Sequence, residues 1–205
     1  MCDDRHSTDP YCPLRVDNEA RWAFLEQYVE SQHRTALDIG CAEGYFTKAV
    51  AECGLEATGV EATEARYERA EATFGDDENV RFRHHRVTPE TVDDLPATDL
   101  TLLLTVQHHW LRAYGVEPAT RMLKHVAQRT SRLFYEPPGD MYVPAQRPID
   151  PSRSVRLYRT YLQRLFDGQA VVRDVEMFDH VEEGEYASRR DPLFVLDTDS
   201  VGSGE

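Results

Sequence analysis

The sequence predicts a single α/β domain in which a largely parallel sheet is covered by helices on both faces. Strand-like segments alternate with segments of helical periodicity along the 205-residue chain, and this alternation is typical of the class. Residues 100–106 form a continuous apolar run of strand length, as expected for a central strand that is buried on both sides. Residues 36–39 form a second strand, which ends directly before a turn that contains two glycines.

The remaining elements follow from hydrophobic periodicity, capping residues and glycine stops. We expect helices at residues 18–32, 45–53, 63–74, 118–128 and 152–166, with a further helix start at 88–91. We expect the other strands at residues 57–61, 80–87, 132–136, 169–178 and 193–197. The domain should span residues 18–197, after a flexible segment or lid at 1–17 and before a mobile tail at 198–205.

The chain is strongly acidic. Its formal net charge is −14, and Lys48 and Lys124 are its only lysines. An acid excess with so little lysine favours a halophilic protein, because high salt screens the self-repulsion, although an acidic protein of an ordinary habitat is the alternative. This charge does not favour binding to nucleic acid at ordinary ionic strength, and the argument weakens at molar salt.

The chain carries no signature of a membrane span or a metal site. No apolar run is long enough to cross a membrane, and the first residues do not resemble a signal peptide. The cysteines Cys2, Cys12, Cys41 and Cys53 lack metal or redox spacing, so we expect reduced thiols in a cytoplasmic protein. Cys2, His6 and Cys12 can be drawn as metal ligands, but a fraying N-terminus explains them more simply, and we predict no metal.

The turn after residues 36–39 has the layout of a nucleotide-type cofactor site. Asp38 lies at the end of the strand, Gly40 permits the backbone angles of a sharp turn, and Gly44 lets the next helix begin close to the strand. The Gly-x-Ala-x-Gly spacing does not match the Gly-x-Gly-x-x-Gly dinucleotide fingerprint. A carboxylate two residues before the first glycine would face a cationic group of a ligand rather than a pyrophosphate.

These residues resemble motif I of the class I S-adenosylmethionine (SAM)-dependent methyltransferases. The resemblance rests on residues 37–44, with Ala42 in place of the family's usual middle glycine, and on Glu61, which ends the next strand. Asp38 and Glu61 are separated by about one strand–helix–strand unit. The resemblance implies a Rossmann-like, seven-stranded, mostly parallel sheet in the order 3-2-1-4-5-7-6, with an antiparallel last strand.

The resemblance also implies a set of cofactor contacts. The amides of the glycine turn would meet the carboxylate of SAM, Asp38 its ammonium group, and Glu61 the two ribose hydroxyls. The alternatives are a helix cap for Asp38, a favourable helix-dipole position for Glu43, and an exposed strand end for Glu61. The predicted cofactor-binding residues are Asp38, Gly40, Cys41, Ala42, Glu43, Gly44, Glu61, Ala62, Val87 and Thr105.

The segment after the third predicted strand departs from the family pattern. Many relatives carry an acid there that accepts a hydrogen bond from the adenine amino group, whereas residues 83–88 contain no carboxylate. We expect backbone atoms near Val87 to recognise the adenine instead, together with backbone contact from Ala62.

The segment after the central strand carries the candidate catalytic residues, because in the family it lies above the transferable methyl group. His108 or His109 would act as a general base near neutral pH; capping the next helix or packing under a loop is the alternative. In an extended segment the two rings cannot point the same way. Trp110 would stack on a substrate or simply pack, and Glu136 would orient a nucleophile or be an exposed strand-end acid. The predicted substrate-binding residues are Tyr45, Trp110, Tyr135 and Glu136.

The resemblance therefore implies a SAM-dependent methyltransferase that aligns an acceptor nucleophile with the sulfonium methyl group. A small-molecule acceptor is favoured because the sequence shows no basic, aromatic-rich platform and no separate recognition domain, while RNA and protein acceptors stay open. A non-catalytic SAM-binding regulatory or assembly protein is the first alternative, and a nicotinamide-dependent oxidoreductase is the second. The sequence does not indicate the acceptor or the oligomeric state.

Overall fold

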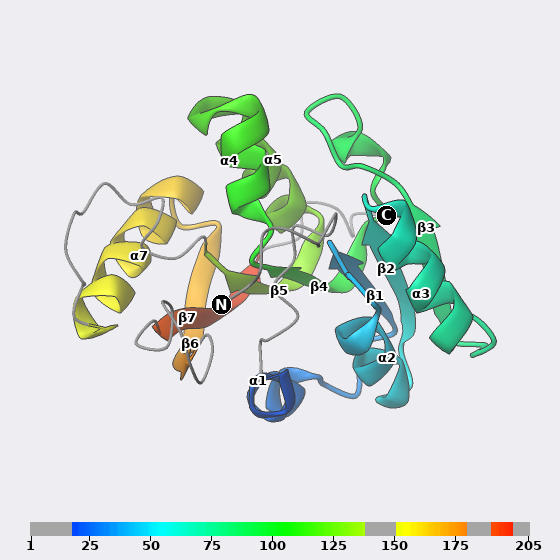
Figure 1. Cartoon of the computed structure of the whole chain (residues 1–205). Helices are drawn as coiled ribbons and strands as arrows, with labels where there is room; N and C mark the ends of the chain where they lie inside the picture. Colours follow the sequence, from blue (N-terminus) through cyan, green and yellow to red (C-terminus); the bar gives the residue numbers. More distant parts are fainter. Residues whose placement is uncertain (1–17, 138–150, 180–189, 199–205) are drawn as a thin grey trace, which may run out of the picture.

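The computed structural model describes residues 18–137, 151–179 and 190–198, which form a seven-stranded sheet with helices on both faces (Figure 1). The strands are β1 (Thr35–Ile39), β2 (Glu56–Glu61), β3 (Val80–His84), β4 (Thr98–Leu104), β5 (Thr130–Glu136), β6 (Ala170–Asp179) and β7 (Arg190–Thr198). The α-helices are α1 (Asn18–Leu25), α2 (Tyr45–Glu52), α3 (Glu64–Phe74), α4 (Gln107–Tyr114), α5 (Val116–Gln128) and α7 (Pro151–Phe166), and the 3-10 helices are η1 (Glu26–Tyr28) and η2 (Val92–Asp94).

The strand order is β3-β2-β1-β4-β5-β7-β6. Strands β1 to β5 pair in parallel, and β7 pairs antiparallel with both β5 and β6. The predicted fold class and strand order are therefore confirmed. Because β1 lies between β2 and β4, the strand order reverses at β1, and ligands of open α/β sheets bind at the carboxyl ends of the strands at such a switch point.

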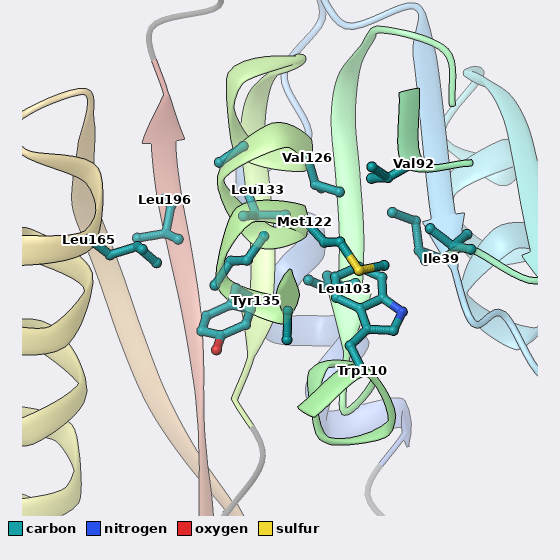
Figure 2. Packing of buried hydrophobic residues seen from close by; sticks show 14 of the residues in the cluster. Ile39, Val92, Leu103, Trp110, Met122, Val126, Leu133, Tyr135, Leu165 and Leu196 are labelled. Carbon is teal, nitrogen blue, oxygen red and sulfur yellow. The ribbon is translucent and has the colours of Figure 1, made fainter. Parts of the chain in front are cut away.

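The sheet separates two apolar clusters. In β4, Leu100 and Leu102 belong to the cluster that includes α1 and α2, whereas Leu103 belongs to the cluster that includes α5 and α7. Figure 2 shows Trp110 of α4 and Met122 of α5 beside Leu103. A strand with both faces buried reads as a continuous apolar run, which is how β4 is recognised in the sequence. This packing fixes the ends of the central strands, where the candidate site lies.

Helix α4 is absent from the sequence prediction. The strand predicted at residues 100–106 ends at Leu104, because Thr105 takes a left-handed backbone conformation with φ of 59°. Val106 is already helical, and α4 begins at Gln107. The two histidines therefore lie on the first turn of a helix, and the expectation based on an extended segment is wrong.

Residues 88–91 do not start an α-helix, in contrast to the prediction. Thr91 Oγ1 accepts a hydrogen bond from the Thr88 amide at 3.0 Å and donates one to the Arg86 carbonyl at 3.1 Å. These local side-chain bonds compete with helix formation and hold a turn that leads into η2.

Two further predicted elements end early. The strand predicted at 80–87 ends at His84, and the helix predicted at 18–32 ends at Leu25, followed by η1 and by extended backbone at Val29. The other predicted boundaries differ from those of the structure by a few residues.

The predicted N-terminal segment, residues 1–17, and all of the predicted tail except Thr198 lie outside the described residues. Of the helices in the described part of the chain, none is both long enough and apolar enough to cross a membrane.

Candidate cofactor-binding site

The turn between β1 and α2 needs glycine at two positions. Gly40 and Gly44 have φ angles of 75° and 86°, a conformation that favours glycine. A Cβ atom on Gly40 would lie 2.6 Å from Cγ2 of Val106, and one on Gly44 would lie 2.6 Å from Cζ of Phe82. The turn therefore lies directly against the segment after β4 and against β3.

Most amides of this turn already have partners inside the protein. The amides of Gly40 and Cys41 donate to the same β2 carbonyl, at 2.7 and 3.2 Å, and the Gly44 amide donates to the Cys41 carbonyl at 2.9 Å. The amide of Ala42 donates to Oε2 of Glu61 at 3.0 Å. A ligand carboxylate at this turn would have to share or displace these bonds.

Asp38 in β1 is a buried carboxylate, with 4% of its surface exposed. Its Oδ2 accepts a hydrogen bond from Oγ1 of Thr47, in the first turn of α2, at 2.8 Å. Burial raises the pKa of the Asp38 carboxyl to about 7; Thr47 and Arg21 oppose this rise, and the charge of Glu61 adds to it. The group is thus close to half-protonated at neutral pH, and an added cation would favour its charged form. The contact with Thr47 also supports the start of α2, so the helix-capping alternative is compatible with a ligand role.

Glu61 at the end of β2 is equally buried, with 5% of its surface exposed. Its Oε2 accepts from the Ala42 amide at 3.0 Å, and its Oε1 accepts from the Thr63 amide at 2.7 Å. These bonds fix the carboxylate between the glycine turn and the start of α3, so the alternative of an exposed strand-end acid is wrong. A carboxylate oxygen has two acceptor sites, so each Glu61 oxygen can accept a further bond from a ligand hydroxyl.

A buried arginine of α1, which the sequence analysis misses, lies close to this site. Arg21 forms an ion pair with the fully buried Glu136 at the end of β5. Its guanidinium carbon lies 4.9 Å from the ring centroid of Phe46, and its charge lowers the pKa of Asp38. Arg21 precedes the buried Leu25 by four positions, so its place on the inner face of α1 is the sequence signal that could have found it.

The end of β4 is also tied to Glu136. Thr105 Oγ1 donates to Oε2 of Glu136 at 3.1 Å, and the Thr105 amide donates to the Glu136 carbonyl at 3.2 Å. The positive φ of Thr105 is unusual for a β-branched residue. Beside it, the hydroxyl of the fully buried Tyr135 donates to Oε1 of Gln107, and burial raises the pKa of Tyr135 well above its ordinary value. These bonds connect the segment between β4 and α4 to the end of β5.

His108 and His109 lie on the first turn of α4, with ring centroids 3.8 Å apart. Part of the His109 surface is exposed, and the protein around the rest of the ring lowers its pKa. Burial has the largest effect, three arginine charges act in the same direction, and the charge of Glu61 opposes them. His109 is therefore neutral at neutral pH and able to accept a proton.

A family model described as a methyltransferase domain matches residues 37–133, from β1 into β5. The matched region contains the glycine turn, both buried acids and the two histidines. Residues 37–133 therefore form a methyltransferase domain. The resemblance of the sequence motif to the class I SAM-dependent methyltransferases, which use SAM as their cofactor, is thus confirmed.

Two curated Escherichia coli relatives, each described as the O-antigen chain terminator bifunctional methyltransferase/kinase WbdD, are 30% identical to this chain over 104 residues. The match covers 49% of this chain and 14% of those relatives. A crystal structure of WbdD has the same fold, with a TM-score of 0.68 at 21% identity over 89% of this chain and 40% of that chain. The magnesium protoporphyrin IX methyltransferase ChlM from Synechocystis PCC 6803, solved with bound SAM, has a TM-score of 0.58 at 16% identity over 88% of this chain and 77% of that chain.

Three of the four residues predicted to contact substrate are buried. Tyr135 and Trp110 lie in the apolar cluster, as Figure 2 shows, which favours the packing alternative for Trp110. Glu136 is paired with Arg21 and is not an exposed strand-end acid. Tyr45 is the exception, since its ring is exposed and makes an edge contact with Phe46 at a centroid distance of 5.0 Å.

The other residues predicted to contact the cofactor differ in their surroundings. Glu43 is exposed and pairs with Arg69 of α3 at 2.9 Å. Cys41 is buried, and burial raises the pKa of its thiol so far that the group stays protonated. The carbonyl oxygen of Ala62 lies 3.3 Å from Nε2 of His84 in β3. Val87 is buried in the same apolar cluster as Trp110. The structure therefore brings together the residues at the ends of β1 and β2 and directs Glu43 away from them.

Proposed function

We propose that this protein transfers the methyl group of SAM to a small-molecule acceptor. The observation that carries the proposal is the pair of buried carboxylates, Asp38 and Glu61, at the ends of neighbouring parallel strands and beside the glycine turn. The edge on which they lie is where open α/β sheets bind nucleotide-like ligands.

The residues at this edge fit the chemical groups of SAM. Asp38 offers a carboxylate to the ammonium group, and a cation beside it would lower its pKa from about 7 and favour the charged form. Glu61 has an acceptor site left on each oxygen for the two ribose hydroxyls. Ala62, which follows Glu61, supplies backbone on the side where the adenine would extend.

SAM supplies a methyl group on a sulfonium, which is already a reactive electrophile. The residues of this chain then have to hold the acceptor in line and exclude water, and such alignment contributes up to about 7–11 kcal/mol of barrier lowering. His109 would accept the proton of a hydroxyl or amine acceptor, since its imidazole is neutral and lies within the electrostatic influence of Glu61. His108, whose ring contacts that of His109, is the second candidate base.

The preference for a small-molecule acceptor is supported by the charge of the chain. A formal net charge of −14 opposes binding to a nucleic acid at ordinary ionic strength. The likeness in fold to the methyltransferases named above does not select an acceptor, because one fold serves many chemistries. Label transfer to RNA or to a protein in an acceptor screen would contradict this part of the proposal.

Calorimetric titration of SAM and S-adenosylhomocysteine at high salt and pH 8 tests the cofactor site. Asp38→Asn and Glu61→Gln are compared with the wild type and with Glu56→Gln, a matched control at the opposite, exposed end of β2. We expect the control to bind like the wild type and the two site variants to bind at least about tenfold more weakly, because each loses a charge-assisted hydrogen bond. No binding by a folded wild-type protein would refute the proposal.

A SAM-binding protein without transferase activity is the second candidate. The burial of Tyr135, Glu136 and Trp110 favours it, because the end of β5 then offers few of the predicted contacts to an acceptor. An acceptor screen with methyl-labelled SAM separates the candidates. Transfer that falls by about 10²–10⁴-fold in His109→Gln supports the enzyme with His109 as its base. SAM binding without transfer to any acceptor class supports the non-catalytic protein.

A further inference from the structure

Three arginines gather beside the proposed cofactor site, although the chain as a whole has a net charge of −14. They are Arg66 in α3, Arg86 after β3 and Arg112 in α4, and we call them the arginine cluster. All three belong to segments that follow the ends of parallel strands, and the charges of all three lower the pKa of His109. The acidic composition of the chain does not account for such a local concentration of positive charge.

Arg66 and Arg86 are held close to Glu61 by short backbone connections. The Thr63 amide donates to Oε1 of Glu61 at 2.7 Å, and the Arg66 amide donates to the Thr63 carbonyl at 3.1 Å in the first turn of α3. On the other side, the His85 amide donates to the Glu61 carbonyl at 2.9 Å, and Arg86 is the next residue. The two arginines therefore flank the end of β2. Arg66 is nearly buried and Arg86 is exposed.

Arg112 approaches the same place from α4. It follows His109 by three residues, so the two side chains share a face of the helix, whereas Gln107 and Trp110 are buried toward the core. Trp110 of α4 and Val87, the residue after Arg86, belong to the same apolar cluster, so α4 packs on the side of the sheet where Arg86 lies. The effects of Arg112 and Glu61 on the pKa of His109 agree with this placement. Figure 1 shows α4 and the segment between β3 and β4 on the same side of the sheet.

We propose that the arginine cluster binds a carboxylate or phosphate group of the methyl acceptor, which makes the acceptor a small organic anion. This inference rests on the proposed function, because it assigns the acceptor of the same site. A guanidinium group is a planar fork of donors that matches two oxygens of a carboxylate or phosphate. Arg86 and Arg112 are exposed and accessible to a ligand, and the nearly buried Arg66 adds a third positive charge.

The test uses inorganic phosphate and acetate as probes of the full chain saturated with SAM. Their dissociation constants are measured by NMR titration in chloride buffer of constant ionic strength, because screening alone would otherwise change the result. Arg86→Gln and Arg112→Gln remove one exposed guanidinium each. Arg121→Gln is the matched control, since Arg121 is an exposed arginine of α5 that pairs with Glu117. Thermal melting of each variant confirms that it is folded.

We expect phosphate or acetate to bind, and each cluster variant to weaken this binding about tenfold while the control leaves it unchanged. Tighter binding of phosphate assigns a phosphate-bearing acceptor, and tighter binding of acetate assigns a carboxylate-bearing one. The inference is overturned if neither anion binds, or if the cluster variants bind the anions as the control does. Failure of SAM itself to bind is a separate result, which refutes the proposed function.

Discussion

The two halves of the carboxyl edge of the sheet hold their buried acids in different ways. At the ends of β1 and β2, Asp38 and Glu61 are bound by a hydroxyl and by backbone amides, and acceptor sites remain on their oxygens. At the end of β5, Glu136 is paired with Arg21 and accepts a bond from Thr105 as well. A hydrogen bond from a neutral donor does not compensate the negative charge of a carboxylate, whereas the positive partner in an ion pair does.

This difference separates a half that is suited to a cationic ligand from a half that stabilises the fold. Burial raises the pKa of Asp38 to about 7, and within the described residues no direct ion pair offsets this rise. The pair of Arg21 and Glu136 instead connects α1 to the end of β5 and, through Thr105, to the segment that leads into α4. Changes in the first half should therefore affect ligand binding, and changes in the second half should affect stability.

Breaking the buried ion pair should have the largest effect. Arg21→Ala leaves Glu136 buried without this partner, and such a change costs about 3–5 kcal/mol of the free energy of unfolding. Urea unfolding measures the loss, with Arg121→Ala on the exposed face of α5 as the control. The double variant Arg21→Met/Glu136→Leu should recover most of the stability, because it removes both charges. A single variant as stable as the control would show that the pair does not hold the two elements.

The extent to which each half can be predicted from the sequence has a physical reason. Gly40 and Gly44 are required by the positive φ angles of the turn. The acids at the ends of β1 and β2 come together because parallel strands bring their carboxyl ends to one edge of the sheet. Both can be recognised in a linear pattern of a few residues, and the strand order follows from the family resemblance.

The second half depends on tertiary contacts that no short pattern contains. Arg21 lies 115 positions from Glu136 in the sequence. Thr105, which has a left-handed backbone conformation, forms hydrogen bonds with the same Glu136, a residue of another strand. Helix α4 begins directly after that conformation, which is why the histidines are read as an extended segment in the sequence. Burial of Tyr135 likewise depends on helices that are distant along the chain.

A substitution in the glycine turn should have an intermediate effect and can be compared with a matched site. Gly44→Ala and Gly54→Ala both place a side chain at a φ near 87°, which costs about 1–2 kcal/mol in each case. Only at Gly44 would the new methyl group meet Phe82, whereas no heavy atom lies within 4 Å of it at Gly54. We expect Gly44→Ala to lose about 1–3 kcal/mol more in denaturant unfolding and to bind SAM more weakly. Equal losses would mean that the turn is not tightly packed against β3.

The smallest expected effect is the pH dependence of the affinity for SAM, which follows from the same pKa shift of Asp38 that makes stability depend on pH. The folded-state pKa of Asp38, about 7, exceeds the ordinary value of 3.8, so its contribution to stability is present below pH 4 and is lost as the pH rises to 7. Affinity for SAM should change in the opposite direction, because a protonated Asp38 has no charge for the ammonium group. We expect about a tenfold decrease in affinity from pH 8 to pH 6, measured by calorimetry. Asp38→Asn should lack both pH dependences, and a wild-type affinity that does not change with pH would argue against a role for Asp38.

The most direct test of the cofactor assignment is a crystal structure of the full chain with S-adenosylhomocysteine. The account predicts that both ribose hydroxyls lie within hydrogen-bond distance of the Glu61 carboxylate and that the amino group of the ligand lies beside Asp38. Density for the ligand at any other place in a well-folded protein would contradict the assignment of this edge of the sheet as the SAM site.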